Sequence, residues 1–397
     1  MKNIKITILL TFLTIFFCKL NAVTIDETAR IILYGSPSYK LGESGVLAEK
    51  ENLKTESNLP DPQLDGEFLA APVGETDRWG AELSWGLEWP GVYGARKKEA
   101  DMKIQTSRKR LEAQRLEQLA SIKSLLLDYI LAFNKLQILK ELDSRNDSIY
   151  EFAEISAKSG QMTVLDLNKV KLENANIRAA MAGVSGEMAQ IISEISQEYG
   201  NDCLPILVKM DCEFPPVDIP QSLNIDKLLS SSPELLALNA ESEAVRLGKK
   251  VATMEALPSL SIGYKHAYED GIHFNGATLG VSIPMFSSRN KQKAAKADIM
   301  ESELKTDAFQ QRVKVELEAL LNRLSIMKEQ IEAIEPLLSD TNHSEMLVKA
   351  YENGLISLID YLTERNYYTN ATIELFNLKH SAAMDMVKLQ KFTNTLD

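Results

Sequence analysis

The chain has 397 residues, of which 45% are apolar and 25% charged, and its formal net charge is −12. This length can hold two or three ordinary domains, and the apolar content is typical of a folded chain. Because the balance of charge is acidic, the composition excludes a basic nucleic-acid-binding protein, and we expect no nucleic acid partner.

The first 22 residues predict a secretory signal peptide. Two lysines precede an apolar run at residues 6–17, which is too short for a comfortable transmembrane helix, and Ala22 offers a small residue for cleavage. Cys18 could carry a lipid anchor, but Phe16 and Phe17 stand where small residues would be needed, so we expect no lipidation. No later stretch has 18 consecutive apolar residues, so we expect no membrane-spanning helix.

The rest of the chain repeats itself at an offset of about 195 residues. The markers are Ser36-Pro37 and Ser232-Pro233, Leu59-Pro60 and Leu257-Pro258, Gly86-x3-Pro90 and Gly280-x3-Pro284, and Gly160-x5-Asp166 and Gly354-x5-Asp360. Four markers in the same order predict an internal tandem duplication with small insertions. We therefore place a first structural repeat at residues 23–220 and a second at residues 221–397.

Each repeat contains an alternating apolar and polar pattern that predicts a β-hairpin, at about residues 61–90 and 258–286. In the first hairpin the three tryptophans of the chain, Trp79, Trp85 and Trp89, fall on one apolar face, with Trp79 and Trp89 at its ends. Strands of about 9–11 residues can cross a bilayer when tilted, and aromatic residues at their ends form girdles at the lipid–water interface. Alternation alone also permits a water-soluble sandwich with the tryptophans in its core.

Four spanning strands leave two open edges, and unpaired backbone groups cannot stay in hydrocarbon. Because the smallest closed membrane barrels need about eight strands, one chain cannot close a barrel. If the strands lie in lipid, several copies of the chain must share the barrel, so we expect a homo-oligomer.

Long heptad repeats predict a coiled-coil hairpin in each repeat, at about residues 95–200 and 287–395. Apolar residues step by three and four at Leu119, Ile122, Leu126, Tyr129, Phe133 and Leu136, at Ile177, Met181, Val184, Met188, Ile191 and Ile195, and at Val313, Leu317, Leu320, Leu324, Met327, Ile331, Ile334 and Leu338. The first helices, at residues 96–159 and 289–353, exceed 60 residues and end at Gly160 and Gly354. Their length would be about 95 Å. Pro336 is a candidate kink in the second of them.

Two cysteines, Cys203 and Cys212, lie nine residues apart in the proline-rich joint between the repeats. In an oxidising compartment we expect them to form a disulfide. Two unpaired thiols remain the alternative if the signal peptide prediction is wrong.

The duplication, the short hairpins and the long coiled-coil hairpins together resemble the TolC-like outer membrane factor family over residues 23–397. Its more specific motifs are the Ser-Pro-Glu-Leu segment at residues 232–235, the two Leu-Pro strand openings, and Tyr351-x-x-Gly354-x5-Asp360-x-Leu362. Glu88-Trp89-Pro90-Gly91 followed by Arg96-Lys97-Lys98 is most similar to the heavy-metal efflux branch.

The resemblance implies an α+β membrane protein: a homotrimer whose twelve-stranded β-barrel, four strands per chain, lies in the outer membrane lipid and continues as a helical tunnel in the periplasm. Residues 24–58 and 225–256 would be helical and lie on its equatorial side. Such trimers work with a periplasmic adaptor protein and an inner-membrane pump as the passive export conduit of a tripartite efflux system for small toxic compounds or metal ions. The alternatives are the channel of a type I protein secretion system and a structural surface coiled coil without a channel.

The resemblance also places a periplasmic gate at the Gly160 and Gly354 turns. Asp360 matches an acidic gate position, Asp166 is its equivalent in the first repeat, and Tyr351 matches a tyrosine that helps to hold the closed state. The chain departs from the family at Thr363, where a second acid is expected, and at Ile356, where a basic lock residue is expected. The alternative role for Asp166 and Asp360 is a negative charge at a helix N-terminus.

No catalytic or cofactor motif occurs: there is neither a phosphate-binding Gly-x4-Gly-Lys-Ser/Thr loop nor His-Glu-x-x-His. We therefore expect no enzyme activity and no cofactor. The four histidines, His266, His273, His343 and His380, are too scattered in sequence to predict a metal site. The methionines Met181, Met188 and Met327 occupy heptad positions, which favours the helical core over soft-metal ligands.

Overall fold

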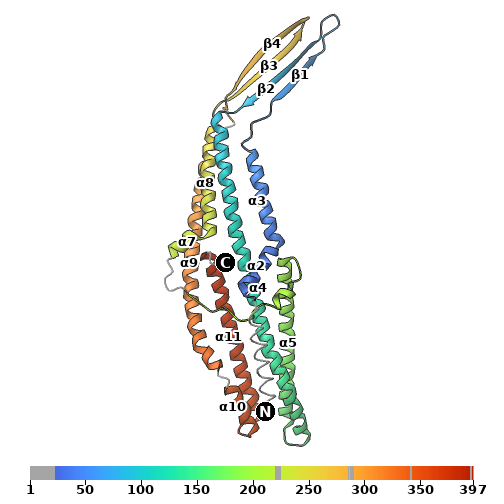
Figure 1. The fold of residues 1–397 in the computed structure, drawn as a ribbon, viewed down its shortest axis with the longest axis vertical. Helices are drawn as coiled ribbons and strands as arrows, with labels where there is room; N and C mark the ends of the chain where they lie inside the picture. The colour runs from blue at the N-terminus through green and yellow to red at the C-terminus, as the bar shows by residue number, and fades with distance from the viewer. Residues whose placement is uncertain are drawn as a thin grey trace, which may run out of the picture. The chain divides into compact units, whose positions relative to one another are not determined.

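The computed structural model describes residues 23–219, 225–284, 286, 290–339, 342–393 and 396. The predicted signal peptide and Cys18 lie outside the described residues. The elements are α2 (Ile25–Gly35), α3 (Pro37–Thr55), β1 (Gln63–Leu69), β2 (Arg78–Leu87), α4 (Pro90–Lys158), α5 (Val164–Tyr199), α6 (Leu204–Leu207), α7 (Ile225–Ser231), α8 (Pro233–Met254), β3 (Ser259–Glu269), β4 (Ile272–Ser282), α9 (Lys291–Ser339), α10 (Asn342–Glu352) and α11 (Leu358–Thr393). Figure 1 shows them in chain order.

The two halves carry their elements in the same order, as the duplication predicts: two helices, two strands and a helical hairpin. The Ser-Pro markers separate α2 from α3 and α7 from α8. Ser36 and Ser232 both have extended backbones, with ψ angles of 128° and 123°. A proline disfavours the helical conformation of the residue before it, so both helices break at the same place.

The chain divides into two compact units, each built from both halves. Unit 1 comprises Met1–Lys40, Arg115–Leu228 and Lys314–Asp397, and unit 2 comprises Leu41–Gln114 and Leu229–Val313.

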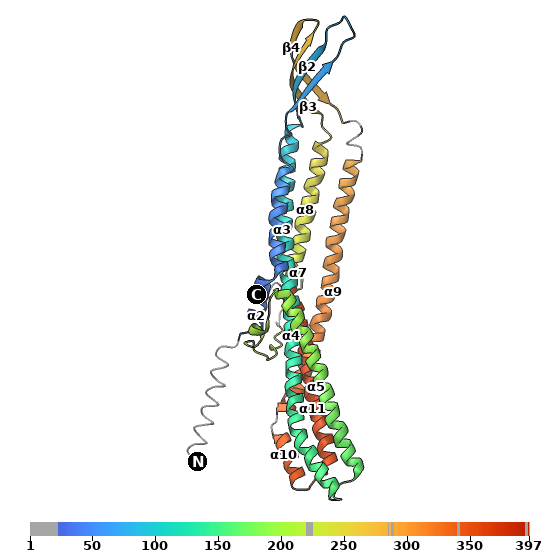
Figure 2. The ribbon, with the colours of Figure 1, turned by 90° about the vertical axis from the view of Figure 1, so that its right-hand side faces the viewer.

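Unit 2 contains one antiparallel sheet in the order β1-β2-β3-β4. Both views show the four strands side by side (Figures 1 and 2). Strands β3 and β4 are joined by Asp270 and Gly271, whose φ angles of 49° and 82° are those of a tight hairpin turn. Strands β1–β2 and β3–β4 form two hairpins whose outer ends lie within about four residues of the predicted bounds, and β2 pairs with β3 to join them into one sheet.

Unit 1 holds the largest apolar core. It packs α2, α4, α5, the segment after α5 and α11 around fully buried residues such as Ile32, Leu126 and Ile195. Figure 2 shows α4, α5 and α11 running side by side in this unit. The first four heptad positions predicted in α4 and the first six in α9, up to Ile331, are buried.

The predicted second long helix is described on both sides of residues 340–341, which lie outside the described residues. Helix α9 ends at Ser339 and α10 begins at Asn342, so the stretch expected at residues 289–353 forms two described helices. Pro336 lies in the last turn of α9, where it removes one backbone donor and clashes with the preceding turn. The Ser339 hydroxyl donates to the Pro336 carbonyl at 3.1 Å, which satisfies one acceptor at this end. The first long helix, α4, is confirmed as one helix of 69 residues.

Candidate functional site

The sheet of unit 2 has one apolar and one polar face. The register places Trp79, Leu83 and Trp85 of β2 beside Tyr268, Tyr264 and Ile262 of β3, all on one face. Both large and small apolar residues of this face are open to solvent, with Leu64 74% and Leu279 80% exposed. A soluble sandwich would cover this face with a second layer, so the sandwich alternative is wrong for the described chain.

The tryptophans lie along this sheet. Trp79, 42% exposed, is the second residue of β2 after the turn, and Trp89 is exposed just beyond the other end of that strand. The Trp85 indole N–H donates to the Pro60 carbonyl at 2.7 Å, which ties this other end of β2 to the chain entering β1. Aromatic residues at both ends of the apolar face are the arrangement of an interfacial girdle.

The opposite face carries hydrogen-bonding groups. Thr278 of β4 donates to Glu82 of β2 at 2.9 Å, across the intervening strand β3. Gly263 lies between them, and a Cβ there would come within 2.8 Å of the Leu83 carbonyl oxygen. Glycine is therefore required for this cross-strand contact. A polar face of this kind fits a wet interior.

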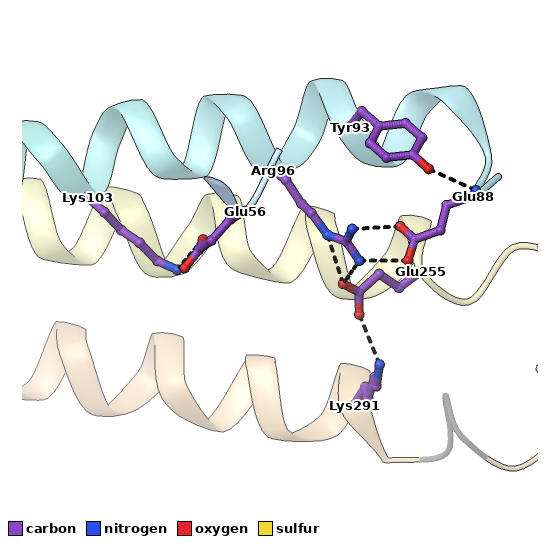
Figure 3. A network of polar contacts seen from close by, with 7 residues as sticks. All are labelled: Glu56, Glu88, Tyr93, Arg96, Lys103, Glu255 and Lys291. Carbon is purple, nitrogen blue, oxygen red and sulfur yellow. Dashed lines mark hydrogen bonds and ion pairs between the residues drawn. The ribbon is translucent and has the colours of Figure 1, made fainter. Parts of the chain in front are cut away.

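An ion-pair network lies where the strands of unit 2 meet the helices. The Arg96 guanidinium on α4 contacts the carboxylates of Glu88 and Glu255, each at 2.8 Å, and Lys291 contacts the other oxygen of Glu255 at 2.9 Å. Figure 3 shows these side chains converging from three helices and the end of β2, and shows the separate Glu56–Lys103 pair. The same residues line a pocket of about 630 Å³.

The charges in this network hold each other ionised. Burial alone would lower the pKa of Arg96, but its hydrogen bonds with Glu255 and Glu88 outweigh that effect and raise it. Burial would raise the pKa of Glu255, but Arg96 and Lys291 together lower it. Through these ion pairs, Glu88 and Arg96 link the end of β2 to α4 and to the end of α8.

The two hairpin turns of unit 1 have the same geometry. Gly160 and Gly354 have φ angles of 74° and 69°, in the left-handed region. After each, a backbone bond closes the helix end: Gln161 N to Ser156 O at 2.8 Å, and Leu355 N to Ala350 O at 2.9 Å. The predicted glycine turns are thus helix C-caps, and this conformation is the reason for the glycines.

Both candidate gate acids bond to the residue that caps the N-terminus of the following helix. The Asp166 N–H donates to the Thr163 hydroxyl oxygen at 3.1 Å, and that hydroxyl donates to the Asp166 carboxylate at 2.8 Å. In the second half, Asp360 N–H lies 3.1 Å from Ser357 Oγ, which donates back to the carboxylate at 2.6 Å. Both acids therefore lie at helix N-termini, where a negative charge interacts favourably with the helix dipole, and their role in a gate stays a prediction. Threonine and serine three residues before an acid are a capping signal that the sequence carried at both turns.

The turns are packed together in unit 1 by a small apolar core. Ala153 of α4 and Val170 of α5 contact Leu358, Tyr361 and Leu362 of α11, with Tyr351 and Ile356 at the edge. Tyr351 packs its ring on Tyr361, with 5.3 Å between the centroids, and burial raises its pKa. Ile356, at the position of the missing basic residue, contributes apolar contact here.

Arg365 is a further residue of this region that sequence reasoning missed. It is buried on α11, and its guanidinium donates to Asn146 of α4 at 3.3 Å and to Glu173 of α5 at 3.4 Å. Burial lowers the pKa of Arg365, an effect that Tyr361 and Glu173 oppose. A single cation thus links both hairpins. No local motif marks it, because its partners lie 219 and 192 residues away.

The predicted disulfide is absent from the structure, where Cys203 and Cys212 are free thiols. The Ser196 hydroxyl donates to Cys203 Sγ at 3.2 Å, and Cys203 is buried against α5. Cys212 Sγ instead contacts the Met210 carbonyl at 3.8 Å. Because Cys203 is held in the core by these contacts, its thiol has partners other than Cys212. Burial, together with Asp211, raises the pKa of the Cys212 thiol to about 11.

Two further searches of the described residues bear on function. No group of three or more histidine, cysteine, aspartate or glutamate side chains there is placed to hold a metal ion. None of the helices in the same part of the chain combines the length and apolar character that crossing a bilayer requires.

Comparison with known proteins gives a consistent picture. Residues 224–395 match the outer membrane efflux protein family model. The fold is similar to that of CusC, whose crystal structures concern transmembrane channel formation, with a TM-score of 0.74 at 16% identity over 94% of this chain and 93% of that one. It is also similar to the Campylobacter jejuni CmeC outer membrane channel (TM-score 0.77, 16% identity, 94% and 86% covered). A third similar structure is the open state of the Neisseria gonorrhoeae MtrE outer membrane channel, with a TM-score of 0.75 at 13% identity over 94% of this chain and 89% of that one. No curated protein gives a significant sequence match. At these identities the structures establish the fold.

Proposed function

We propose that this chain is an outer membrane export channel, because residues 224–395 match the outer membrane efflux protein family model and 94% of the chain shares the fold of CusC, CmeC and MtrE. Three copies share one barrel in the outer membrane, and their helical parts lie in the periplasm. The channel is a passive conduit that an inner-membrane pump energises and a periplasmic adaptor connects. Its cargo is small toxic compounds or metal ions.

The observation that carries this proposal is the four-stranded sheet. Its apolar face is uncovered, its other face is polar, and its edge strands β1 and β4 have free backbone edges. Ten residue steps separate Trp79 from Trp89, about 33 Å along an extended chain. At a tilt of about 45° this corresponds to roughly 25 Å, the height of the apolar band of outer membrane barrels. Closing the two edges requires further copies of the chain.

A pair of neighbouring substitutions on β2 tests the barrel. Leu83→Lys places a charge on the apolar face, and Ser84→Lys places the same charge on the polar face one residue along. A lysine facing lipid near the bilayer midplane costs about 2–4 kcal/mol, whereas a lysine in a wet lumen costs much less. We expect a detergent-extracted trimer for the wild type and Ser84→Lys, and loss of the trimer for Leu83→Lys. Equal behaviour of the two variants would show that this face does not meet lipid.

The transport role needs a separate measurement. The purified trimer should conduct ions in planar bilayers, and a strain lacking the protein should become sensitive to metals, bile salts, dyes or antibiotics. A stable trimer that conducts no ions would favour the structural coiled-coil alternative. A deletion strain that loses a secreted polypeptide while keeping its resistance would favour type I secretion.

A further inference from the structure

A cluster of polar side chains interrupts the apolar face of the sheet near the β3–β4 turn. His266 of β3 and His273 of β4 stack with 5.3 Å between their ring centroids, and His266 Nε2 lies 3.4 Å from His273 Nδ1. On its other side, His266 Nδ1 lies 2.6 Å from the side-chain oxygen of Asn275. The Tyr264 hydroxyl donates to the same oxygen at 2.9 Å. Spacing along the sequence conceals this cluster, because only the strand register brings it together.

The contact with Asn275 determines which nitrogen of His266 is free. The Asn275 oxygen can only accept, so His266 must donate its Nδ1 proton to it. The lone pair of His266 then lies on Nε2, the atom that faces His273. This is the arrangement in which a histidine binds a metal through one nitrogen while a carbonyl oxygen orients the ring through the other.

The distance between the two facing nitrogens fits one shared ion. Two nitrogens bound to one tetrahedral metal at about 2.0–2.1 Å lie about 3.4 Å apart. His266 Nε2 and His273 Nδ1 are separated by 3.4 Å before any ion is present. Imidazole nitrogen is a preferred ligand of Zn²⁺, Cu²⁺ and Ni²⁺. Binding would require only that His273 carry its proton on Nε2.

The surroundings keep the pair accessible to water. His273 and Asn275 are exposed and His266 is half-buried. The two histidines lie within about four residues of the turn, at the level of Trp79 and Tyr268, whose rings contact them. Polar groups are too costly to bury in hydrocarbon, so this end of the sheet belongs at the headgroup level. The turn also lies at the opposite end of the strands from the helices of unit 2 (Figure 1).

We propose that His266 and His273 form a binding site for one Zn²⁺, Cu²⁺ or Ni²⁺ ion, with Asn275 as the residue that orients His266 and with water as the remaining ligands. Each chain contributes one complete site, since both ligands belong to the same hairpin. The site's position at the cell surface rests on the proposed function, whereas its ability to bind metal does not.

Copper quenching of tryptophan fluorescence provides a local readout. The Trp79 ring lies 5.2 Å from His266 and 6.4 Å from His273, close enough for a bound Cu²⁺ to quench it. In the purified full chain in detergent, CuCl₂ should quench part of the emission in a saturable way, and ZnCl₂ should reverse it by competition. Trp79→Phe, which leaves Trp85 and Trp89 in place, should remove the saturable component without removing the binding measured by calorimetry.

Five variants separate the roles of these residues. His266→Ala and His273→Ala should each raise the apparent Kd for Zn²⁺ at least about tenfold, while His380→Ala, a histidine paired with Asp128 in unit 1, should leave it unchanged. Asn275→Asp should tighten binding, because a carboxylate orients the ring and raises its basicity, and Asn275→Leu should weaken it.

Two results would overturn the proposal. One is Zn²⁺ affinity that is unchanged in both His266→Ala and His273→Ala, and the other is copper quenching that persists in Trp79→Phe. Failure of the channel proposal would look different, since a protein without conductance could still bind the metal at this pair. The cell-surface position is tested by adding CuCl₂ to intact cells that display the protein and measuring whether it protects His273 from diethyl pyrocarbonate.

Discussion

Ser357 and Asp360 close a capping box at the start of α11, in which the serine hydroxyl lies 2.6 Å from the carboxylate and 3.1 Å from the Asp360 amide nitrogen. At the start of α5, three residues after Gly160, the Thr163 hydroxyl likewise bonds to both the amide nitrogen and the carboxylate of Asp166. The acids therefore have a structural role already, and a gate role is separable from it only by variants that remove one without the other.

Comparing Asp360→Ala with Ser357→Ala separates the capping role of Asp360 from its predicted gate role. Each removes one partner of the capping box and should destabilise the start of α11 by about 1 kcal/mol. Asp360→Ala also removes a carboxylate that three chains would bring close to one axis, so it should reduce cation preference and block by multivalent cations. Bilayer recordings should show this change for Asp360→Ala alone. If Ser357→Ala alters selectivity equally, the acid acts only as a cap.

Tyr351 should act through its ring. Because the structure packs the ring against Tyr361 at 5.3 Å, Tyr351→Phe should keep this contact and leave the closed state near that of the wild type. Tyr351→Ala removes the ring and should increase the conductance of the resting channel. Comparison of the two in planar bilayers checks this. A change of the same size in Tyr351→Phe would instead show that the Tyr351 hydroxyl holds the closed state.

Arg365 should couple the two hairpins of unit 1. Arg365→Met keeps much of the side-chain volume but removes the donors to Asn146 and Glu173, which should destabilise this region by about 1–3 kcal/mol. Arg365→Lys restores the charge but not the planar group that spans both partners, so it should recover only part of the loss. Hydrogen exchange of residues 146–173 provides the measurement. Exchange that is unchanged in Arg365→Met would contradict the coupling.

The junction network of unit 2 should weaken in acid. The ion pairs with Arg96 and Lys291 lower the folded-state pKa of Glu255 below its ordinary value of 4.5, so its contribution to stability is complete above that pH. The contribution is lost as the pH falls below 4.5 through the folded pKa. Limited proteolysis between pH 6 and pH 3.5 should show the ends of α8 and α4 opening in acid. In Glu255→Gln the opening should not depend on pH over this range. If this variant still opens in acid as the wild type does, groups other than Glu255 cause the transition.

The two cysteines should remain free. Without a reductant, iodoacetamide added after unfolding should label both Cys203 and Cys212, as detected by mass spectrometry of the peptides. In the folded protein Cys212 should react about a hundredfold more slowly than an ordinary thiol at pH 8, because its pKa of about 11 leaves little thiolate. A peptide pair joined by a disulfide before reduction would contradict the structure.

Local patterns in the sequence determined the elements of this protein. Alternation with period two placed the two hairpins within about four residues at their outer ends, because each sheet face meets one environment over most of its length. Heptad periodicity marked the buried positions Leu119 to Tyr129 and Val313 to Ile331, and Gly160 and Gly354 marked turns that need a positive φ. These features depend on neighbours a few residues away, which is why the sequence contains them.

Only the tertiary structure decided which of these elements meet. Arg365 bonds to residues on α4 and α5, and His266 contacts His273 and Asn275. Helix packing and strand register bring these residues together, and no regular spacing along the sequence marks them. The disulfide prediction failed for the same reason, since nine residues of separation do not determine where two thiols point. Pro336 was recognised as a perturbation, but whether it kinks a helix or ends it depends on the packing around the last turn.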